Sequence, residues 1–388
     1  MRLIPLIFIF ILLLAGGCWD SNEISNSYAA SGIAIDSTQD NQYLYTVQIP
    51  TPIPRQTGKQ SRGQVPGKRE PFQVISTTAP NFAQASREVS LKTPRNPLWQ
   101  HTHVCIVGED LAAKGIGGLI DHFIRNHNIR KNNYLFIAHK TTAEEVIKTS
   151  NDLEPVSSNA LMSMIKAQES TLGIYTSVKL AEFIRKSLEP GIEPTVPGVM
   201  VEELEGKKTL KLDGTAVFCL GQLKGWLNED ESQGYRWLRP GTVKGGTTLI
   251  FCPVCKKPVL LTLFSSKSSI RPEIKDGRVI MHITIRQQGS FYEQGCRHHL
   301  FTRKMIPVLE NEAEKAVEEK VQNAVKKAQS LGTDIFGFGR LLKATYPDKW
   351  SAMSRDWAKL FPQVEITTAV DYKIINGFLT VDSLTLRY

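Results

Sequence analysis

Five residues carry the chemistry that this sequence offers most clearly. Cys18 follows an apolar stretch and three small residues, where a thiol can receive a lipid. Cys252 and Cys255 form a C-x-x-C pair, and Cys296 and His298 follow about forty residues later. C-x-x-C is a common spacing of zinc ligands, and a second pair of such ligands completes a tetrahedral site. The same cysteines can also form a structural disulfide.

The choice between a disulfide and a metal site depends on the compartment. An exported protein favours oxidised cysteines, so we expect a disulfide from Cys252 or Cys255 to Cys296. A zinc site that includes His298 is the alternative, although C-x-H, or C-x-x-H with His299, departs from a regular knuckle. Redox catalysis is the least favoured interpretation, because no thioredoxin-type strand-helix turn holds the C-x-x-C pair.

The other cysteines and the paired histidines are expected to be structural. Cys105 and Cys219 fall within apolar strand-like segments, where a buried thiol is unreactive. His101 and His103 can share one strand face, but no third metal ligand lies near them in the sequence. Four tryptophans are interpreted as core or interdomain anchors, with an aromatic ligand cage as the alternative: Trp226, Trp237, Trp350 and Trp357.

Catalytic motifs are missing from the sequence. No G-x-S-x-G elbow, phosphate-binding P-loop, complete G-x-G-x-x-G or H-E-x-x-H occurs. Carboxylates do not pair within apolar segments in a way that predicts a raised pKa. We therefore expect no catalytic residue, no enzymatic activity and no cofactor other than a covalent lipid.

The first seventeen residues have the pattern of a secretory signal. Arg2 precedes an apolar run over residues 3–14, and small residues then lead to Cys18. The run is shorter than the roughly 20 residues that a membrane-spanning helix needs. A cleavage site that ends on cysteine resembles the lipobox of bacterial lipoproteins, although Ala15 stands where leucine is usual. We expect an exported chain anchored by lipid on Cys18, since two acyl chains give stable anchoring.

Charge and composition indicate the surroundings of the exported chain. The formal net charge is +9, which in an anchored protein suits anionic lipid headgroups. No basic helix with interleaved aromatic residues argues for nucleic acid. Residues 50–71 are rich in Pro, Gly, Gln, Lys and Arg without periodicity, and are expected to form a basic flexible loop.

The hydrophobic patterns predict a mixed α/β and α+β fold in three domains, with mixed or antiparallel sheets packed by helices. After the signal peptide, residues 1–17, the expected units are an N-terminal α/β domain over 18–195, a small middle domain over 196–243 and a C-terminal α+β domain over 244–388.

Several turns and one helix are predicted more specifically. Asp40-Asn41 and Asp213-Gly214 are expected to join neighbouring strands, and a loop before the strand at 279–285 closes on Asp276-Gly277. Apolar positions spaced by three or four predict a long helix over 306–331 that ends at glycine. Asn376-Gly377 predicts a C-terminal hairpin.

Short strings along the whole chain resemble one known family, the Ger(x)C lipoproteins, which are the C subunits of spore germinant receptors. Each string alone is weak, and their order and spacing carry the resemblance, together with Arg125 and Arg130. The strings are GCWD at 17–20, GIAID at 32–36, HV at 103–104, VGEDLA at 107–112, DGTAVF at 213–218, LKGWL at 223–227, DIFGFG at 334–339 and PDKW at 347–350.

The resemblance implies a non-enzymatic, lipid-anchored subunit that works with two integral membrane proteins, the A and B subunits. It places the protein on the outer face of the cell membrane and at the inner membrane of the spore, where such receptors respond to nutrients and trigger germination. It also implies three domains of α/β type and offers no catalytic residue to carry over. Ala15 and the second cysteine of the C-x-x-C pair depart from the family pattern. The alternative function is an exported lipoprotein that binds a solute or metal ion itself.

Overall fold

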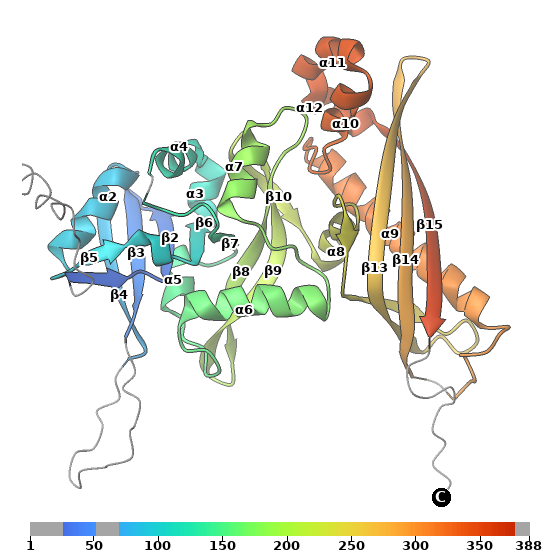
Figure 1. Ribbon diagram of the computed structural model, residues 1–388, viewed down its shortest axis with the longest axis horizontal. Coiled ribbons are helices and arrows are strands. Elements are labelled where there is room, and N and C mark those ends of the chain that lie inside the picture. Colours follow the sequence, from blue (N-terminus) through green and yellow to red (C-terminus); the bar gives the residue numbers. More distant parts are fainter. Residues whose placement is uncertain (1–25, 52–69, 127, 296, 377–388) are drawn as a thin grey trace, which may run out of the picture.

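The computed structural model describes residues 26–51, 70–126, 128–295 and 297–376. Two sheets with packed helices lie side by side in Figure 1, which confirms the mixed α+β class. Five predicted features fall wholly or partly outside the described residues: the signal peptide over residues 1–17, Cys18, Cys296, most of the basic loop, and the hairpin turn at Asn376-Gly377 with the strand after it.

The N-terminal sheet has eight strands in the order β10-β9-β8-β7-β6-β2-β3-β4. The predicted hairpin across Asp40-Asn41 is confirmed, because β2 and β3 pair antiparallel and Asn41 has a φ of 54°. β2, β6, β7 and β8 run parallel, which requires helical crossovers between them. The strands are β2 (Gly32–Ser37), β3 (Tyr43–Pro50), β4 (Phe72–Ala79), β6 (Val104–Gly108), β7 (Tyr134–Ala138), β8 (Thr195–Leu204), β9 (Lys207–Cys219) and β10 (Gln222–Leu227). A separate parallel pair joins β1 (Ser27–Ala29) and β5 (Asn96–Leu98).

Helices cover both faces of this sheet and enclose two hydrophobic cores. Phe123 and Phe183 belong to the core on one face, and Leu161 and Ile165 to the core on the other. The first face carries α2 (Phe82–Glu88), α3 (Glu109–Lys114), α4 (Gly117–Arg125) and α7 (Leu180–Leu188), and the second carries α5 (Ala143–Lys148) and α6 (Ser157–Ser170).

Most of the expected middle domain belongs to the N-terminal sheet. The boundary near residue 195 falls inside a continuous sheet, because β8 pairs parallel with β7 and continues into β9 and β10. The turn predicted at Asp213-Gly214 is wrong, since β9 runs through it. Gly214, with a φ of 73°, lies at a bulge opposite Gly198, and the reversals occur at Glu205-Gly206 and Leu220-Gly221 instead.

The C-terminal sheet packs against one long helix. Asp276-Gly277 turns β13 into β14 with positive φ at both residues, as predicted. The helix predicted over 306–331 is confirmed as α9 (Ile306–Ser330), and Gly332 follows it with a φ of 64°. Met281 and Ile283 face α9 in a shared core. The strands are β11 (Thr242–Val243), β12 (Thr247–Phe251), β13 (Pro258–Lys275), β14 (Arg278–Gln294) and β15 (Glu365–Asn376), the last pairing parallel with β14.

Helix α8 (Glu229–Trp237) joins the two sheets. Tyr235 and Trp237 are buried in the C-terminal core, and Gly234 lets the backbone of α8 approach that of α9 at Lys320. A second junction lies at α10 (Phe338–Thr345), where the N–H of Arg340 donates to the carbonyl of Gly191 at 2.9 Å. α11 (Pro347–Met353) and α12 (Trp357–Leu360) complete this end, and Trp237, Trp350 and Trp357 are core residues as predicted.

Candidate functional site

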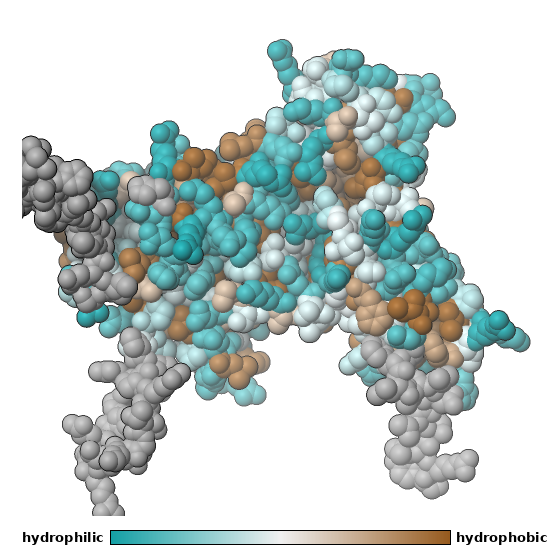
Figure 2. All heavy atoms as spheres, in the orientation of Figure 1, coloured by the Kyte–Doolittle hydropathy of each residue, from teal (hydrophilic) through white to brown (hydrophobic). Residues whose placement is uncertain are grey.

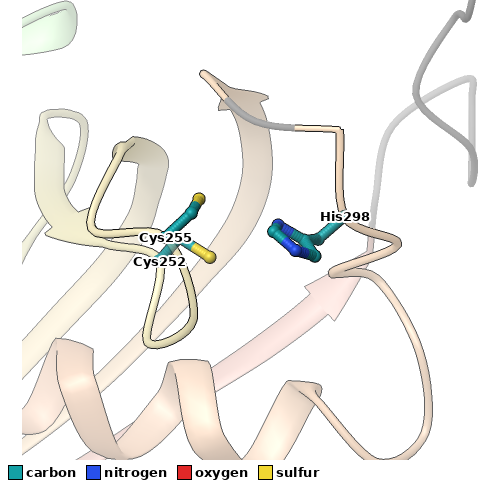
Figure 3. A group of neighbouring side chains, drawn as sticks. All are labelled: Cys252, Cys255 and His298. Atoms are coloured by element: carbon teal, nitrogen blue, oxygen red, sulfur yellow. The ribbon is translucent and has the colours of Figure 1, made fainter.

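Cys252 and Cys255 lie in the short connection between β12 and β13 (Figure 3). The N–H of Lys256 donates to the carbonyl of Cys252 at 2.9 Å, and the N–H of Cys252 donates to the carbonyl of Lys257 at 2.8 Å. Lys256 has a φ of 58°, in the left-handed region that favours glycine. This tight reversal holds the two sulfur atoms within 4.8 Å of each other.

His298 reaches the same place from a distant part of the sequence. It lies between β14 and α9, and in Figure 3 its imidazole ring faces the two thiols. One ligand atom from each of the three side chains lies within 4.8 Å of the other two. Cys252 is buried, Cys255 is half-buried and His298 is exposed, so the cluster opens to solvent on the histidine side. The structure thus brings together three of the four ligands that the sequence suggested.

The structure does not test the expected disulfide, because Cys296 lies outside the described residues. No disulfide joins Cys255 to Cys252 in the described structure. Within the described part of the chain, this cluster is the only place where three His, Cys, Asp or Glu side chains offer ligand atoms so close together. The cluster is therefore the strongest candidate for metal chemistry in the described structure.

The other cysteines lie on strands of the N-terminal sheet, and the paired histidines lie at the surface. Cys105 is buried in β6, and burial raises the pKa of its thiol to about 12. Burial, and then the charge of Glu193, raises the pKa of Cys219. His101 and His103 are mainly exposed, but the imidazole ring of His103 is partly covered. This partial burial, and then the charge of His101, lowers the pKa of His103. A thiol with a raised pKa is a poor nucleophile at neutral pH.

A second cluster joins residues from three of the family strings. The indole N–H of Trp226 donates to the carboxylate of Glu109 at 2.7 Å, and its ring stacks on His139 with centroids 3.8 Å apart. His139 Nδ1 lies 2.9 Å from the carboxylate of Asp213. The backbone N–H of Lys140 donates to Glu109 at 3.0 Å. Sequence reasoning missed this grouping, although the strings VGEDLA, DGTAVF and LKGWL contain three of its members.

The DIFGFG string surrounds a buried carboxylate. One oxygen of Asp334 accepts the backbone N–H groups of Phe336, Gly337 and Phe338, at 2.8–3.2 Å. The other accepts the N–H of Gly339 at 2.7 Å and the indole N–H of Trp357 at 3.0 Å. Burial raises the pKa of Asp334, and these donors oppose the rise. Five donors occupy the carboxylate, so its role is to organise the backbone.

The surface near the cysteine-histidine cluster is partly apolar. In the view of Figure 2, hydrophobic side chains form several groups among hydrophilic ones, and one of these groups lies at the lower end of the C-terminal sheet. Phe251, Val254 and Tyr292, on or between the strands of that sheet, are more than half exposed. Among the described residues, no helix has both the length and the apolar character needed to cross a bilayer.

Comparison with known families covers almost the whole chain. The profile "Spore germination protein N-terminal domain" matches residues 20–201, and "Spore germination B3/ GerAC like, C-terminal" matches residues 213–377. The chain belongs to the GerAC family of spore germination proteins. The resemblance inferred from the short strings is therefore confirmed.

Individual relatives of this GerAC family member match over nearly their full length. Spore germination protein KC of Bacillus subtilis (strain 168) is 27% identical over 382 residues, covering 94% of this chain and 93% of the relative. Spore germination protein B3 of the same organism is 28% identical over 379 residues, covering 95% and 96%. The crystal structure of the GerBC protein matches with a TM-score of 0.58 and 23% identity, covering 89% of this chain and 97% of that one. This likeness shows a shared fold.

Proposed function

We propose that this chain is the lipid-anchored C subunit of a spore nutrient germinant receptor, and that it acts with membrane A and B subunits to trigger germination. The observation that carries the proposal is the match of two spore germination profiles to residues 20–201 and 213–377. The curated relatives named for spore germination align over more than nine-tenths of their length. The role therefore belongs to the whole chain, not to one shared module.

Internal contacts of the family strings support a non-enzymatic role. Glu109 binds an indole and a backbone N–H, and Asp334 accepts five N–H groups. A general acid or base must be within reach of a substrate proton. These carboxylates instead accept hydrogen bonds from groups of the protein itself, so their role is structural. We infer that the strings preserve an arrangement of two sheets, as a scaffold or accessory subunit requires.

The membrane attachment is proposed from the sequence. Cys18 lies shortly before β1, which begins the described fold at Ser27. Acylation of Cys18 would hold the two sheets on the outer face of the cell membrane, and on the inner membrane of the spore. The excess of positive charge adds attraction to anionic lipid headgroups.

The test replaces the acylated residue in the spore. In the proposed function, Cys18→Ala abolishes the nutrient response and moves the protein from the membrane to the soluble fraction. Cys219→Ser is the matched control. It replaces another cysteine, on β9, that is not the proposed acylation site, so it should leave both properties unchanged. Germination at the wild-type rate by spores that hold only soluble Cys18→Ala protein would contradict the proposal.

One observation favours the alternative of direct solute binding. A cavity of about 750 Å³ lies between α2, α4 and β5, and Phe82, Trp99 and His122 are among its lining residues. Such a volume is within the range of small-molecule sites. Calorimetric titration of the chain with amino acids, sugars and nucleosides separates the two functions. Stoichiometric binding that is lost in Trp99→Ala would favour solute capture over a scaffold role.

A further inference from the structure

We propose that Cys252, Cys255 and His298 bind one zinc-type divalent metal ion, which stabilises the C-terminal domain. The inference does not depend on the proposed function, because it rests on the geometry of three side chains. Two thiolates and an imidazole are the donor set of structural zinc sites. Such soft donors disfavour calcium and magnesium, which prefer oxygen ligands.

The connection between β12 and β13 has the shape of a metal knuckle. Pro253 follows Cys252 and fixes the backbone φ where the turn begins. Lys256 adopts the left-handed conformation directly after Cys255, although a lysine in that region is strained. Hydrogen bonds from Lys256 to Cys252 and from Cys252 to Lys257 close the turn. A tight turn that keeps two thiols on one side is the arrangement that a single metal ion requires.

The three ligand atoms would need to move only a short way to bind a metal ion. Zinc bonds of about 2.3 Å to sulfur and about 2.0 Å to nitrogen place tetrahedral ligand atoms roughly 3.5–3.8 Å apart. The three ligand atoms already lie within 4.8 Å of one another. Closure by about 1 Å therefore suffices, and the exposed side chain of His298 and the half-buried side chain of Cys255 can supply it without moving the buried Cys252.

The segment that carries His298 already contacts the rest of the C-terminal domain, and a metal bond would add to those contacts. It connects the end of β14 at Gln294 to the start of α9 at Ile306. Leu300 packs into the core, and the side chain of Gln294 donates to the carbonyl of His298 at 2.7 Å. A metal bond between this segment and the β12–β13 connection would cross-link residues about 45 positions apart in the sequence. Such a cross-link restricts the unfolded chain as a disulfide does.

Three ligands define the site and leave one tetrahedral position. Water fills such a position in open sites, and a fourth protein ligand closes it in structural ones. Metal binding also competes with the disulfide to Cys296 that the exported compartment favours, because either reaction consumes the same thiols. The experiment must therefore measure metal content and disulfides in the same sample.

The test uses the full chain purified in detergent, loaded with zinc under reducing conditions and washed free of excess metal. Elemental analysis should find about one zinc ion per chain, and Cys252→Ser, Cys255→Ser and His298→Gln should each lower the content by about tenfold or more. Cys219→Ser and His101→Gln, which change residues outside the cluster, should retain the metal. Cobalt in place of zinc should give the intense visible absorption of a tetrahedral thiolate complex, a readout that does not depend on any variant.

Two results would overturn the site. One is a reduced, zinc-treated wild-type chain that holds no stoichiometric metal and gives no cobalt-thiolate absorption. The other is mass spectrometry of the chain from spore membranes that finds Cys252 or Cys255 joined to Cys296 in a disulfide. Circular dichroism of each variant distinguishes the loss of a ligand from the loss of the fold, since an unfolded variant also loses its helical signal.

Discussion

The indole N–H of Trp357 donates a hydrogen bond of 3.0 Å to the buried carboxylate of Asp334. This bond joins α12 to the turn that precedes α10, so the three short helices after α9 are held around one acidic group. The carbonyl of Asp334 in turn accepts the N–H of Glu193, which follows α7 of the N-terminal half. One residue therefore organises both the C-terminal helices and their contact with the other sheet.

Replacement of Asp334 by asparagine should destabilise the protein. The amide places an N–H₂ group where the carboxylate accepts backbone donors, so at least one buried donor loses its partner. We expect Asp334→Asn to lower the free energy of unfolding by about 2–3 kcal/mol, measured by urea denaturation. The control is Asp348→Asn, on the exposed first turn of α11, which should change it by less than about 0.5 kcal/mol. Equal midpoints for Asp334→Asn and wild type would contradict this account.

The contact between the two halves predicts a strong effect at Gly191. This residue has a φ of 84°, and an added Cβ would lie 2.6 Å from the backbone of Gly339 and Arg340. Gly191→Ala should therefore cost more than the roughly 1–2 kcal/mol that left-handed alanine costs alone. Gly206→Ala is the matched control, since Gly206 has a φ of 76° and nothing lies within 4 Å of its added Cβ. Calorimetric unfolding should show the larger loss for Gly191→Ala, and equal losses would show that the close approach is unimportant.

A partly buried ion network predicts a pH-dependent contribution to stability. Glu182 on α7 lies 3.1 Å from Lys186 and 2.7 Å from Arg239. Burial opposes ionisation of Glu182, but Arg239 and Lys186 outweigh it and lower its pKa. A lowered pKa in the folded state stabilises the protein above the unfolded value of about 4.3, and the contribution disappears as the pH falls through the folded pKa.

Because ionised Glu182 stabilises the folded state, Glu182→Gln should lose that stabilisation at neutral pH. At pH 7 the variant should be less stable than wild type by about 1–3 kcal/mol. The difference should shrink as the pH falls below the unfolded value of about 4.3, and it should disappear once the pH is below the lowered pKa of folded Glu182. Glu202→Gln removes a partner that lies 3.4 Å from Lys211 and is more exposed than Glu182, so it should change stability by less than about 1 kcal/mol at either pH. A deficit of Glu182→Gln that is the same at pH 3 and pH 7 would rule out the charge interaction as its cause.

Local signals in the sequence predicted turns and helix ends correctly where the neighbouring residues alone determine them. Asp40-Asn41, Asp276-Gly277 and the glycine after α9 lie where turn and capping chemistry placed them. Asp213-Gly214 has the same local chemistry but forms no turn. It lies at the bulge opposite Gly198, where the strands pack so closely that a Cβ added to Gly198 would meet the ring of Trp226 and the backbone of Asp213. Tertiary packing thus keeps β9 continuous, and the middle segment extends the N-terminal sheet.

The candidate site shows the same difference between local patterns and tertiary placement. The C-x-x-C spacing is local, so Cys252 and Cys255 could be paired from the sequence alone. The sequence also suggested His298 as a partner of this pair, but its actual approach depends on how β14 and α9 place the segment between them, which no short pattern encodes. The cluster of Glu109, His139 and Trp226 gathers residues from three separate segments, and only the folded sheet brings them together.

We propose that this GerAC family member works within a membrane receptor. The most direct measurement is to tag the chain at its C-terminus, solubilise spore membranes in mild detergent, purify the tagged chain and identify what accompanies it. The proposed function predicts two multi-spanning spore germination proteins in comparable amounts, and their loss when the tagged chain carries Cys18→Ala. Recovery of the wild-type chain without either membrane protein, from spores that respond normally to nutrients, would contradict it.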